Sequence, residues 1–218
     1  MARKKKINKE DIYTFYMNYY LENGRAPSSA YELAKLHNFD EKDFYTFFGN
    51  LKTVEKSIFD SFYDQTLLLL QNSEDFESFD VRNKLLSFYY TYFEILTANR
   101  SFVMALASKS TFKYDLLKLL SSTKRKFSFF VQRLEIDKFD LKDTKLDEFI
   151  DRSIEESLWV QFVVCFKFWL DDESASLEKT DIFIEKSVNT GFDLLNVKPL
   201  RSILDLGKFL YHEKIHMN

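Results

Sequence analysis

The stretch SAYELAKLHNFDEKDFYTFFGNLKTV, residues 29–54, decides which fold this chain is expected to adopt. Ser29 is followed three residues later by Glu32, which is the spacing of a capping box, where two side chains satisfy free amides at a helix start. A helix is therefore predicted to begin at Ser29. It is predicted to end at His37 and Asn38, because asparagine tolerates the left-handed conformation of a helix end.

A second short helix is predicted over Glu41–Phe47, with Asp40 as its cap. Upstream, Asn8 is predicted to cap a longer helix that ends at Gly24. Three helices of these lengths, the third short and preceded by a tight turn, match the order of a helix-turn-helix unit. Apolar residues of the last two helices are expected to face inward: Leu33, Leu36, Phe44, Phe47 and Phe48.

This segment resembles the DNA-binding segment of the tetracycline-repressor (TetR) family. That family's pattern has a hydrophobic-Ala pair, a short turn, a Tyr, an aromatic-Phe pair, a Gly or Ser, and a Lys. The corresponding features here are Leu33-Ala34, His37 to Asp40, Tyr45, Phe47-Phe48, Gly49-Asn50 and Lys52. The sequence departs from the pattern at Glu41 and Asp43, which make the front of the recognition helix acidic, and at Leu51, where a lysine is expected.

The resemblance covers the whole chain and implies an all-α, TetR-like fold in two domains. Residues 1–52 would form a three-helix, helix-turn-helix DNA-binding domain, and residues 53–218 a larger helical ligand-binding and dimerisation domain. The implied function is a DNA-binding transcriptional regulator, acting as a repressor, that an apolar small-molecule effector controls. Its partners would be a second copy of the chain and a palindromic operator in double-stranded DNA.

The residues expected at the DNA fall into three groups. The N-terminal arm is basic, and residues 1–56 carry ten Lys and Arg against eight Asp and Glu; such an arm follows a minor groove or backbone, although a solvated tail is the alternative. A second group is expected to hold phosphates and a third to contact base edges. The arm comprises Arg3, Lys4, Lys5 and Lys6. The residues expected to hold phosphates are Ser28, Ser29, Tyr45 and Lys52, and those expected to contact base edges are Lys42 and Thr46.

Composition favours long helices with short connections, since the 218 residues include only four Gly and two Pro. The one cysteine, Cys165, indicates a reducing compartment. Residues 7–20 are amphipathic and unlike a signal peptide, and the longest apolar run, Leu158–Leu170, is too short to span a bilayer. A cytoplasmic protein without stable membrane insertion is expected.

Catalytic chemistry has little support in the sequence. Three histidines and one cysteine form no plausible pair of nucleophile and base, and there is no glycine-rich phosphate loop. His212 and His216 are four residues apart, but two ligands near a chain end do not make a metal site. We therefore expect a protein that is not an enzyme and that has no metal or cofactor.

Beyond the three-helix segment within residues 1–52, which we call the headpiece, apolar spacing predicts further helices that bring the total to about ten. The expected ranges are Thr53–Asn72, with Leu69 facing inward, Asp80–Asn99, Ser101–Ala107, Phe112–Leu134, Leu146–Leu170, Ser176–Asn196 and Pro199–His212.

The helix Leu146–Leu170 is apolar on nearly every side in its second half, so it is expected to be buried on every side. The next helix carries an apolar stripe in which Gly191 allows close approach. Together they predict a two-fold, four-helix interface, although the central core of a monomer is the alternative. The expected interface residues are Trp159, Val163, Leu170, Ile184, Val188, Gly191 and Leu195.

Phe and Tyr account for most of an aromatic content of 17%. In the resembled fold, the helices that carry many of these residues surround an effector cavity, which would suit a fatty, aromatic or isoprenoid-like molecule. The alternative is an ordinary core, because aromatic rings at helical spacing bury large areas. The expected pocket residues are Tyr89, Tyr92, Phe93, Phe102, Phe127, Phe130, Phe162 and Phe166.

A second hypothesis is a non-catalytic lipid- or isoprenoid-binding protein of the same fold that has lost DNA binding. The stretch FWLDDESASLEKTDIFIEKSVNTGFDLL, residues 168–195, followed by PLRSILDLGKFLY, residues 199–211, is similar to the tail of ubiquinone-biosynthesis accessory proteins. Glu41 and Asp43 agree with this hypothesis. A scaffold without a ligand is a third possibility.

Overall fold

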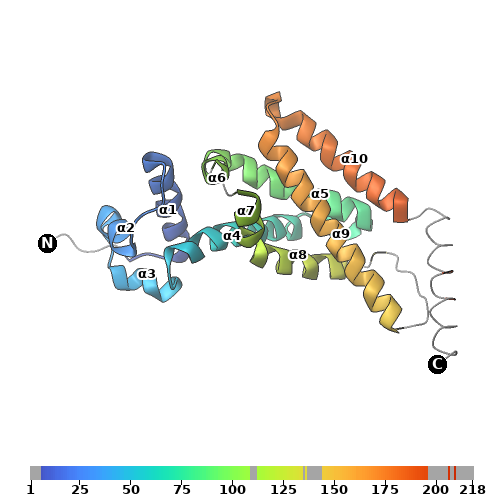
Figure 1. Ribbon diagram of the computed structural model, residues 1–218, viewed down its shortest axis with the longest axis horizontal. Coiled ribbons are helices and arrows are strands. Elements are labelled where there is room, and N and C mark those ends of the chain that lie inside the picture. The colour runs from blue at the N-terminus through green and yellow to red at the C-terminus, as the bar shows by residue number, and fades with distance from the viewer. Residues whose placement is uncertain are drawn as a thin grey trace. The chain divides into compact units, whose positions relative to one another are not determined.

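A computed structural model describes residues 6–108, 112–134, 136, 144–195, 206 and 209. Over these residues the secondary structure consists of ten α-helices and two short 3-10 helices, with no β-strand (Figure 1). The expected all-α fold is confirmed. By its internal contacts the chain forms two compact units, Met1–Leu68 with Glu94–Arg125, and Leu69–Phe93 with Lys126–Asn218. These differ from the stretches 1–52 and 53–218, whose status as domains stays a prediction.

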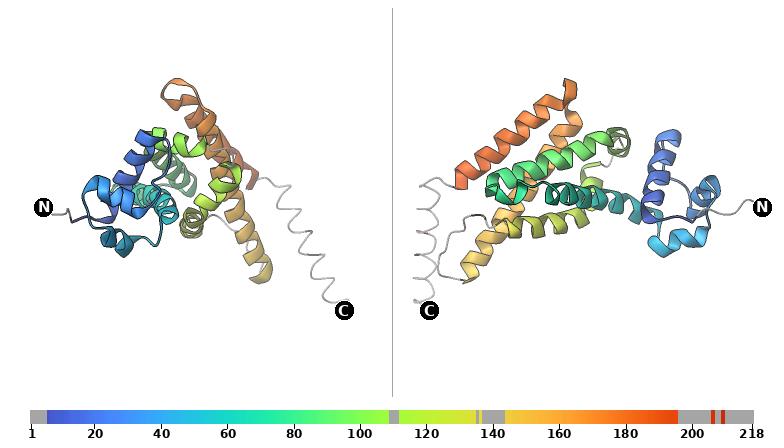
Figure 2. Two further views of the ribbon diagram at one scale, coloured as in Figure 1. Left: turned by 60° about the vertical axis from the view of Figure 1, so that its left-hand side comes forward. Right: turned by 180° about the vertical axis from the view of Figure 1, so that it is seen from behind.

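The first unit begins with the three headpiece helices, which Figure 2 shows from two further directions. Its helices are α1 (Lys9–Asn23), α2 (Ala30–His37), α3 (Glu41–Phe47), most of α4 (Leu51–Gln71), α6 (Arg100–Ala107) and α7 (Phe112–Leu119). Helix α1 packs against α2 and α6, and α2 packs against α3.

Side-chain caps set the limits of the headpiece helices, as predicted. Asn8 and Asp11 form a reciprocal capping box at the start of α1, and Gly24 ends the helix with a left-handed φ of 65°. The Ser29 side chain caps α2, and Asn38 ends it with φ of 55°. Asp40 accepts a hydrogen bond from the first turn of α3.

The second unit contains the remaining long helices and a core of aromatic rings. Its elements are the 3-10 helix η1 (Phe76–Ser78), most of α5 (Val81–Ala98) and of α8 (Ser121–Arg133), α9 (Thr144–Asp171), the 3-10 helix η2 (Ala175–Leu177) and α10 (Glu178–Leu195). Helices α9 and α10 lie side by side (Figures 1 and 2). Asp172, only 5% exposed, accepts hydrogen bonds from the backbone and hydroxyl groups of Ser174 and Thr180 and so fixes the start of α10.

The helix predicted over Phe112–Leu134 is wrong, because α7 and α8 are separate and meet at the fully buried Leu120. Three hydroxyl residues, Ser121, Ser122 and Thr123, directly follow Leu120. Such residues are weak helix formers in a helix interior and favour helix starts. The helix predicted over Pro199–His212 lies outside the described residues apart from Leu206 and Phe209.

Three residues predicted to face inward are exposed instead: Leu36, Phe47 and Leu69 are 57%, 40% and 55% exposed. In α3 the inward direction is set by Phe44 and by Phe48 one turn later, both buried. At 100° per residue, Phe47 is turned well away from that direction. A short helix buries only one narrow stripe, so a run of aromatic residues cannot all be buried.

Candidate nucleic-acid interface

The turn between α2 and α3 is held by backbone and apolar contacts. The amide of Phe39 donates to the carbonyl of Ala34 at 3.1 Å, and the Phe39 side chain is only 2% exposed. Its ring stacks on Phe15 of α1 with 5.9 Å between centroids. The two helices of the motif are therefore anchored on the first helix, which leaves one side of α3 open to solvent.

Glu32 of α2 accepts hydrogen bonds from three residues of the headpiece. One carboxylate oxygen accepts from the Tyr19 hydroxyl and from Arg25, and the other accepts from the amide and the hydroxyl of Ser28 at 2.6 and 2.7 Å. The Tyr19 bond, followed by those from Ser28 and Arg25, holds the pKa of Glu32 far below its usual range. The predicted reciprocal bond to the Ser29 amide is wrong, since Glu32 bonds Ser28 instead.

The two serines expected at phosphates consequently differ in whether their hydroxyl hydrogen is already used in a hydrogen bond. The hydroxyl of Ser28 donates to Glu32, so its hydrogen is used inside the headpiece. Ser29 accepts from the Glu32 amide at 3.1 Å, and that bond does not use its hydroxyl hydrogen. Of the two, Ser29 is better placed to donate to a phosphate.

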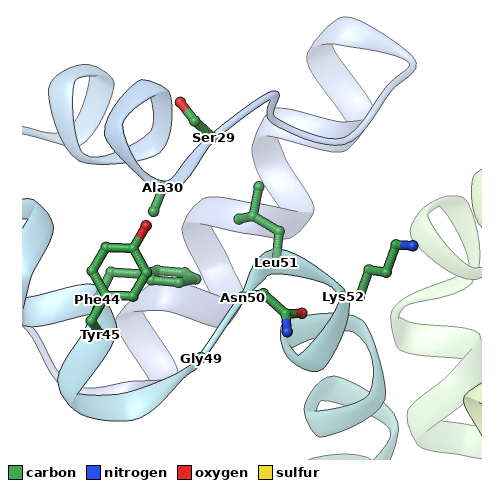
Figure 3. Close-up of a pocket in the computed structure, with 8 residues that line it drawn as sticks. All are labelled: Ser29, Ala30, Phe44, Tyr45, Gly49, Asn50, Leu51 and Lys52. Carbon is green, nitrogen blue, oxygen red and sulfur yellow. The ribbon is translucent and has the colours of Figure 1, made fainter.

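A hollow with a volume of about 460 Å³ lies where α2, α3 and α4 begin or end (Figure 3). The start of α2, the second half of α3 and the first turn of α4 each contribute side chains to its wall (Figure 3). The lining residues are Ser29, Ala30, Phe44, Tyr45, Gly49, Asn50, Leu51 and Lys52. Three of the four residues predicted to hold phosphates, Ser29, Tyr45 and Lys52, therefore line one hollow.

The first turn of α4 gives this hollow a positive edge. Asn50 accepts from the amide of Thr53 at 3.1 Å through its side chain, so it acts as the cap of this 21-residue helix. The first turn contains no acidic residue, and Lys52 is exposed. Free amides and the helix dipole make such a terminus attractive to a phosphate group.

The exposed side of α3 carries both residues predicted to contact base edges. The Lys42 side chain is 80% exposed, with its ammonium 4.0 Å from the Asp40 carboxylate. The Thr46 hydroxyl donates to the carbonyl of Asp43 at 2.6 Å. Tyr45 is 55% exposed, and its hydroxyl lies 3.5 Å from the Glu41 carboxylate. In the N-terminal arm Lys6 is exposed, while Arg3, Lys4 and Lys5 lie outside the described residues.

In the second unit the structure brings together seven of the eight residues predicted to line an effector pocket. Their rings pack closely, for example Tyr92 against Phe162 at 5.1 Å and Phe127 against Phe162 at 5.5 Å between centroids. Phe102 is the exception, because it belongs to the first unit and meets Tyr20 edge-on at 5.8 Å. Its placement in the pocket is wrong. We call the remaining set, which is Tyr89, Tyr92, Phe93, Phe127, Phe130, Phe162 and Phe166, the aromatic cluster.

The pocket prediction left out several aromatic residues that contact this cluster, among them Phe88 and Trp159. Phe88 is fully buried and stacks on Phe130 at 4.6 Å, and Trp159 stacks on Phe162 at 5.3 Å. Helical spacing gives the signal for Phe88, since it precedes Tyr92 by one turn. Trp159 could not be assigned this way, because it lies on a helix that is apolar on several sides.

A small group of polar side chains borders the aromatic cluster. The buried Tyr89 hydroxyl lies 3.0 Å from the Leu158 carbonyl and 3.2 Å from the side-chain oxygen of Gln161. The Gln161 amide donates to the Ser187 carbonyl at 2.7 Å. Burial raises the pKa of the Cys165 thiol to about 11, so this thiol is protonated at neutral pH and is a poor nucleophile.

The predicted dimer interface is only partly available on the surface. Ile184 and Val188 are fully buried within the chain and Trp159 is 5% exposed, so these three residues pack into the protein's own core and not onto a partner. Val163, Leu170 and Gly191 are partly exposed, and the Leu195 side chain lies outside the described residues. Among the described side chains of the two helices, the exposed large apolar ones are Val160, Val164, Ile182 and Leu194.

Among the described residues, no helix has the length and apolar character that crossing a bilayer requires. Within the same residues, no group of three His, Cys, Asp or Glu side chains lies close enough together to hold a metal ion.

Comparison with known proteins identifies the class to which this architecture belongs. A family model described as "Tetracyclin repressor-like, C-terminal domain" matches residues 84–210. The match spans more than half of the chain, which therefore belongs to the tetracycline-repressor-like (TetR) family of transcriptional regulators. The family predicted from the headpiece is thus confirmed by a match to the other part of the chain.

A solved structure supports the same fold. The fatty acid degradation regulator FadR from Bacillus halodurans matches 89% of this chain and 100% of its own, with a TM-score of 0.53 and 16% sequence identity. At this identity the likeness concerns the fold alone. No curated protein matches the chain.

Proposed function

We propose that this protein is a DNA-binding transcriptional repressor whose affinity for its operator is controlled by an apolar small molecule. The observation that carries the proposal is the site formed by the exposed side of α3 and the adjacent hollow. Tyr45 and Lys52 both line this hollow, which lies at the start of α4, while Lys42 projects into solvent from the helix that would enter the major groove.

Different charged residues of the headpiece would attract phosphates and contact bases. Asp40, Glu41 and Asp43 surround Lys42 at the front of α3, so this helix adds little attraction to phosphates. That attraction has to come from Lys52, the start of α4 and the basic arm. Lys42 then acts mainly on base edges, where an ammonium group donates to O6 or N7 of guanine.

These separate roles can be tested by fluorescence-anisotropy titrations with duplex DNA at a series of salt concentrations. The first duplex is the promoter of the protein's own gene. Tyr45→Phe and Lys52→Gln should both weaken binding, and Lys52→Gln should lower the slope of log affinity against log salt by about 1. Tyr31→Phe, an exposed tyrosine of α2, and Lys118→Gln on α7 are the matched controls. Absence of binding to any DNA, or variants indistinguishable from their controls, contradicts the proposal.

The effector would bind among the rings of the aromatic cluster. These rings are apolar and closely packed, and Tyr89 with Gln161 offers polar atoms at the edge of the cluster. A long acyl or isoprenoid chain suits such surroundings, and the structurally similar FadR is a regulator of fatty acid degradation. A ligand that binds the DNA-free state more tightly shifts the population away from the operator.

The protein would form a homodimer through the exposed sides of α9 and α10, and this homodimer would bind a palindromic operator. Val160 and Val164 of α9 and Leu194 of α10 are 58%, 47% and 60% exposed, next to the predicted contacts Val163, Leu170 and Gly191. Sedimentation velocity tests this: Val164→Lys should yield monomers, whereas Phe129→Lys on α8, where the side chain is 67% exposed, should not. A monomeric unmodified protein contradicts the homodimer.

The second candidate, a lipid-binding protein without DNA affinity, is favoured by one observation. Two carboxylates, Glu41 and Asp43, occupy the first turn of α3, where they oppose phosphates. Native mass spectrometry of the gently purified protein separates the two candidates. A bound acyl or isoprenoid lipid together with no DNA affinity supports the lipid-binding protein, and DNA affinity rejects it.

A further inference from the structure

The exposed side of α3 presents apolar groups at two consecutive positions. Thr46 is exposed, and its hydroxyl is turned back to the Asp43 carbonyl at 2.6 Å. Its hydrogen-bond donor is therefore used within the helix, and the methyl group remains as the part that can meet another surface. Phe47, which has no polar atom, is 40% exposed.

The base edges of DNA offer one apolar group to such side chains. In the major groove each base pair presents hydrogen-bond donors and acceptors, and thymine adds a C5-methyl group. Threonine methyl groups and phenylalanine rings are among the side chains that contact it. On the same side of the helix, Lys42 supplies a donor one turn before Thr46.

We propose that this protein recognises thymine C5-methyl groups in its operator through the methyl group of Thr46 and the ring of Phe47. The inference rests on the proposed function, since it requires that α3 enters the major groove. Lys42 and Thr46 are separated by about 6 Å along the helix, which corresponds to about two base pairs. The operator half-site thus has thymine within about two base pairs of the base that Lys42 contacts.

The test uses DNA that differs from the operator only in methyl groups. Duplexes that bind the full-length protein are selected from a random-sequence library, and each thymine of the selected site is then replaced by deoxyuridine. This replacement keeps every hydrogen-bonding atom and removes the methyl group. Loss of one buried methyl contact corresponds to about fourfold weaker binding, so we expect such a loss at one or two positions in each half-site.

Protein variants then show which side chain the methyl group meets. Thr46→Ser removes the methyl group and keeps the hydroxyl that bonds Asp43, and Phe47→Ala removes the ring. In at least one of the two variants, the thymine and deoxyuridine duplexes should bind equally well. Thr14→Ser on α1 is the matched control, because the exposed Thr14 also bonds a carbonyl of its own helix, that of Glu10, and it should leave the fourfold difference unchanged.

Two results overturn the inference while the proposed function survives. One is DNA binding that no deoxyuridine replacement weakens. The other is a methyl dependence that persists unchanged in both Thr46→Ser and Phe47→Ala. A protein that selects no duplex at all contradicts the proposed function itself, and the inference with it, so the two kinds of failure are separated by the selection step.

Discussion

The headpiece and the aromatic cluster differ in the sequence separation of the contacts within each of them. In the headpiece, Asn8 bonds Asp11 and Ser29 bonds Glu32, each across three residues. In the cluster, Tyr89 bonds Leu158 across 69 residues, and its ring meets Phe162 at 5.7 Å. In the headpiece, polar caps close in sequence fix the ends of the helices, whereas the aromatic cluster consists of rings that come together only when the chain folds.

This difference suggests how each region responds to change. A cap or a left-handed glycine affects one helix end, and its loss costs about 1 kcal/mol. A buried ring touches many others, so its removal leaves a cavity that costs several times as much. The exposed side of α3 belongs to the region with local contacts, which allows its outer residues to vary without disturbing a core.

The largest effect is expected at the centre of the aromatic cluster. Phe162→Ala removes a ring that is 1% exposed and contacts Tyr89, Tyr92, Phe93, Phe127 and Trp159. It should lower the free energy of unfolding by about 3–5 kcal/mol in urea denaturation. Phe129→Ala, at a residue 67% exposed, is the control and should change it by less than about 0.5 kcal/mol. Equal effects would remove the distinction between core and surface rings.

A smaller effect is expected from strain at a helix end of the headpiece. Gly24→Ala places a Cβ atom on a backbone with φ of 65°, which costs about 1–2 kcal/mol. Gly49→Ala is the control, because its backbone is not left-handed and no atom lies within 4 Å of the added Cβ. Urea denaturation should place Gly24→Ala below Gly49→Ala in stability. The reverse order would contradict the importance of this cap.

The contribution of hydrogen bonding within the cluster should be smaller again. Tyr89→Phe keeps the buried ring and removes the hydroxyl near Leu158 and Gln161, with an expected loss of about 1 kcal/mol. Tyr90→Phe, at a half-buried neighbouring residue, should change the free energy of unfolding by less than about 0.5 kcal/mol. If Tyr89→Phe is as stable as this control, ring packing alone accounts for the stability of the cluster.

The smallest expected effect is the pH dependence of stability that arises from the hydrogen bonds of Glu32. Its folded-state pKa is depressed, chiefly by the Tyr19 hydrogen bond, so its stabilising contribution is complete above about pH 4.3, the unfolded value, and is lost as the pH falls below it. Thermal unfolding should show Glu32→Gln less stable than the unmodified protein at pH 7, with the gap narrowing on acidification. Glu22→Gln, at an exposed residue, should run parallel to the unmodified protein, and a constant gap for Glu32→Gln would refute the assignment.

Sequence reasoning succeeded where a structural signal is local. The capping residues Asn8, Ser29 and Asp40 and the left-handed ends at Gly24 and Asn38 were all predicted, because each depends on bonds within about four residues. The candidate site followed from them, since Lys42, Tyr45 and Thr46 are exposed once α3 is placed. The hollow beside them was not predicted, because it requires the start of α4 to lie near the start of α2.

Apolar spacing alone could not decide which neighbour covers each residue. Phe102 was assigned to the cluster but packs on Tyr16 and Tyr20, and Val188, expected at a partner, is buried within the chain. A helical period identifies an apolar side without identifying the surface against which it packs.

The sequence by itself determined the limits of the headpiece helices and, through them, the family resemblance, because capping bonds and backbone preferences act between residues close along the chain. Tertiary structure alone decided which aromatic rings meet, that Phe47 faces outward, and that Tyr45 and Lys52 share one hollow. Those outcomes depend on packing between distant segments, where the apolar area of all neighbours is buried at once and no single stretch of sequence specifies the result.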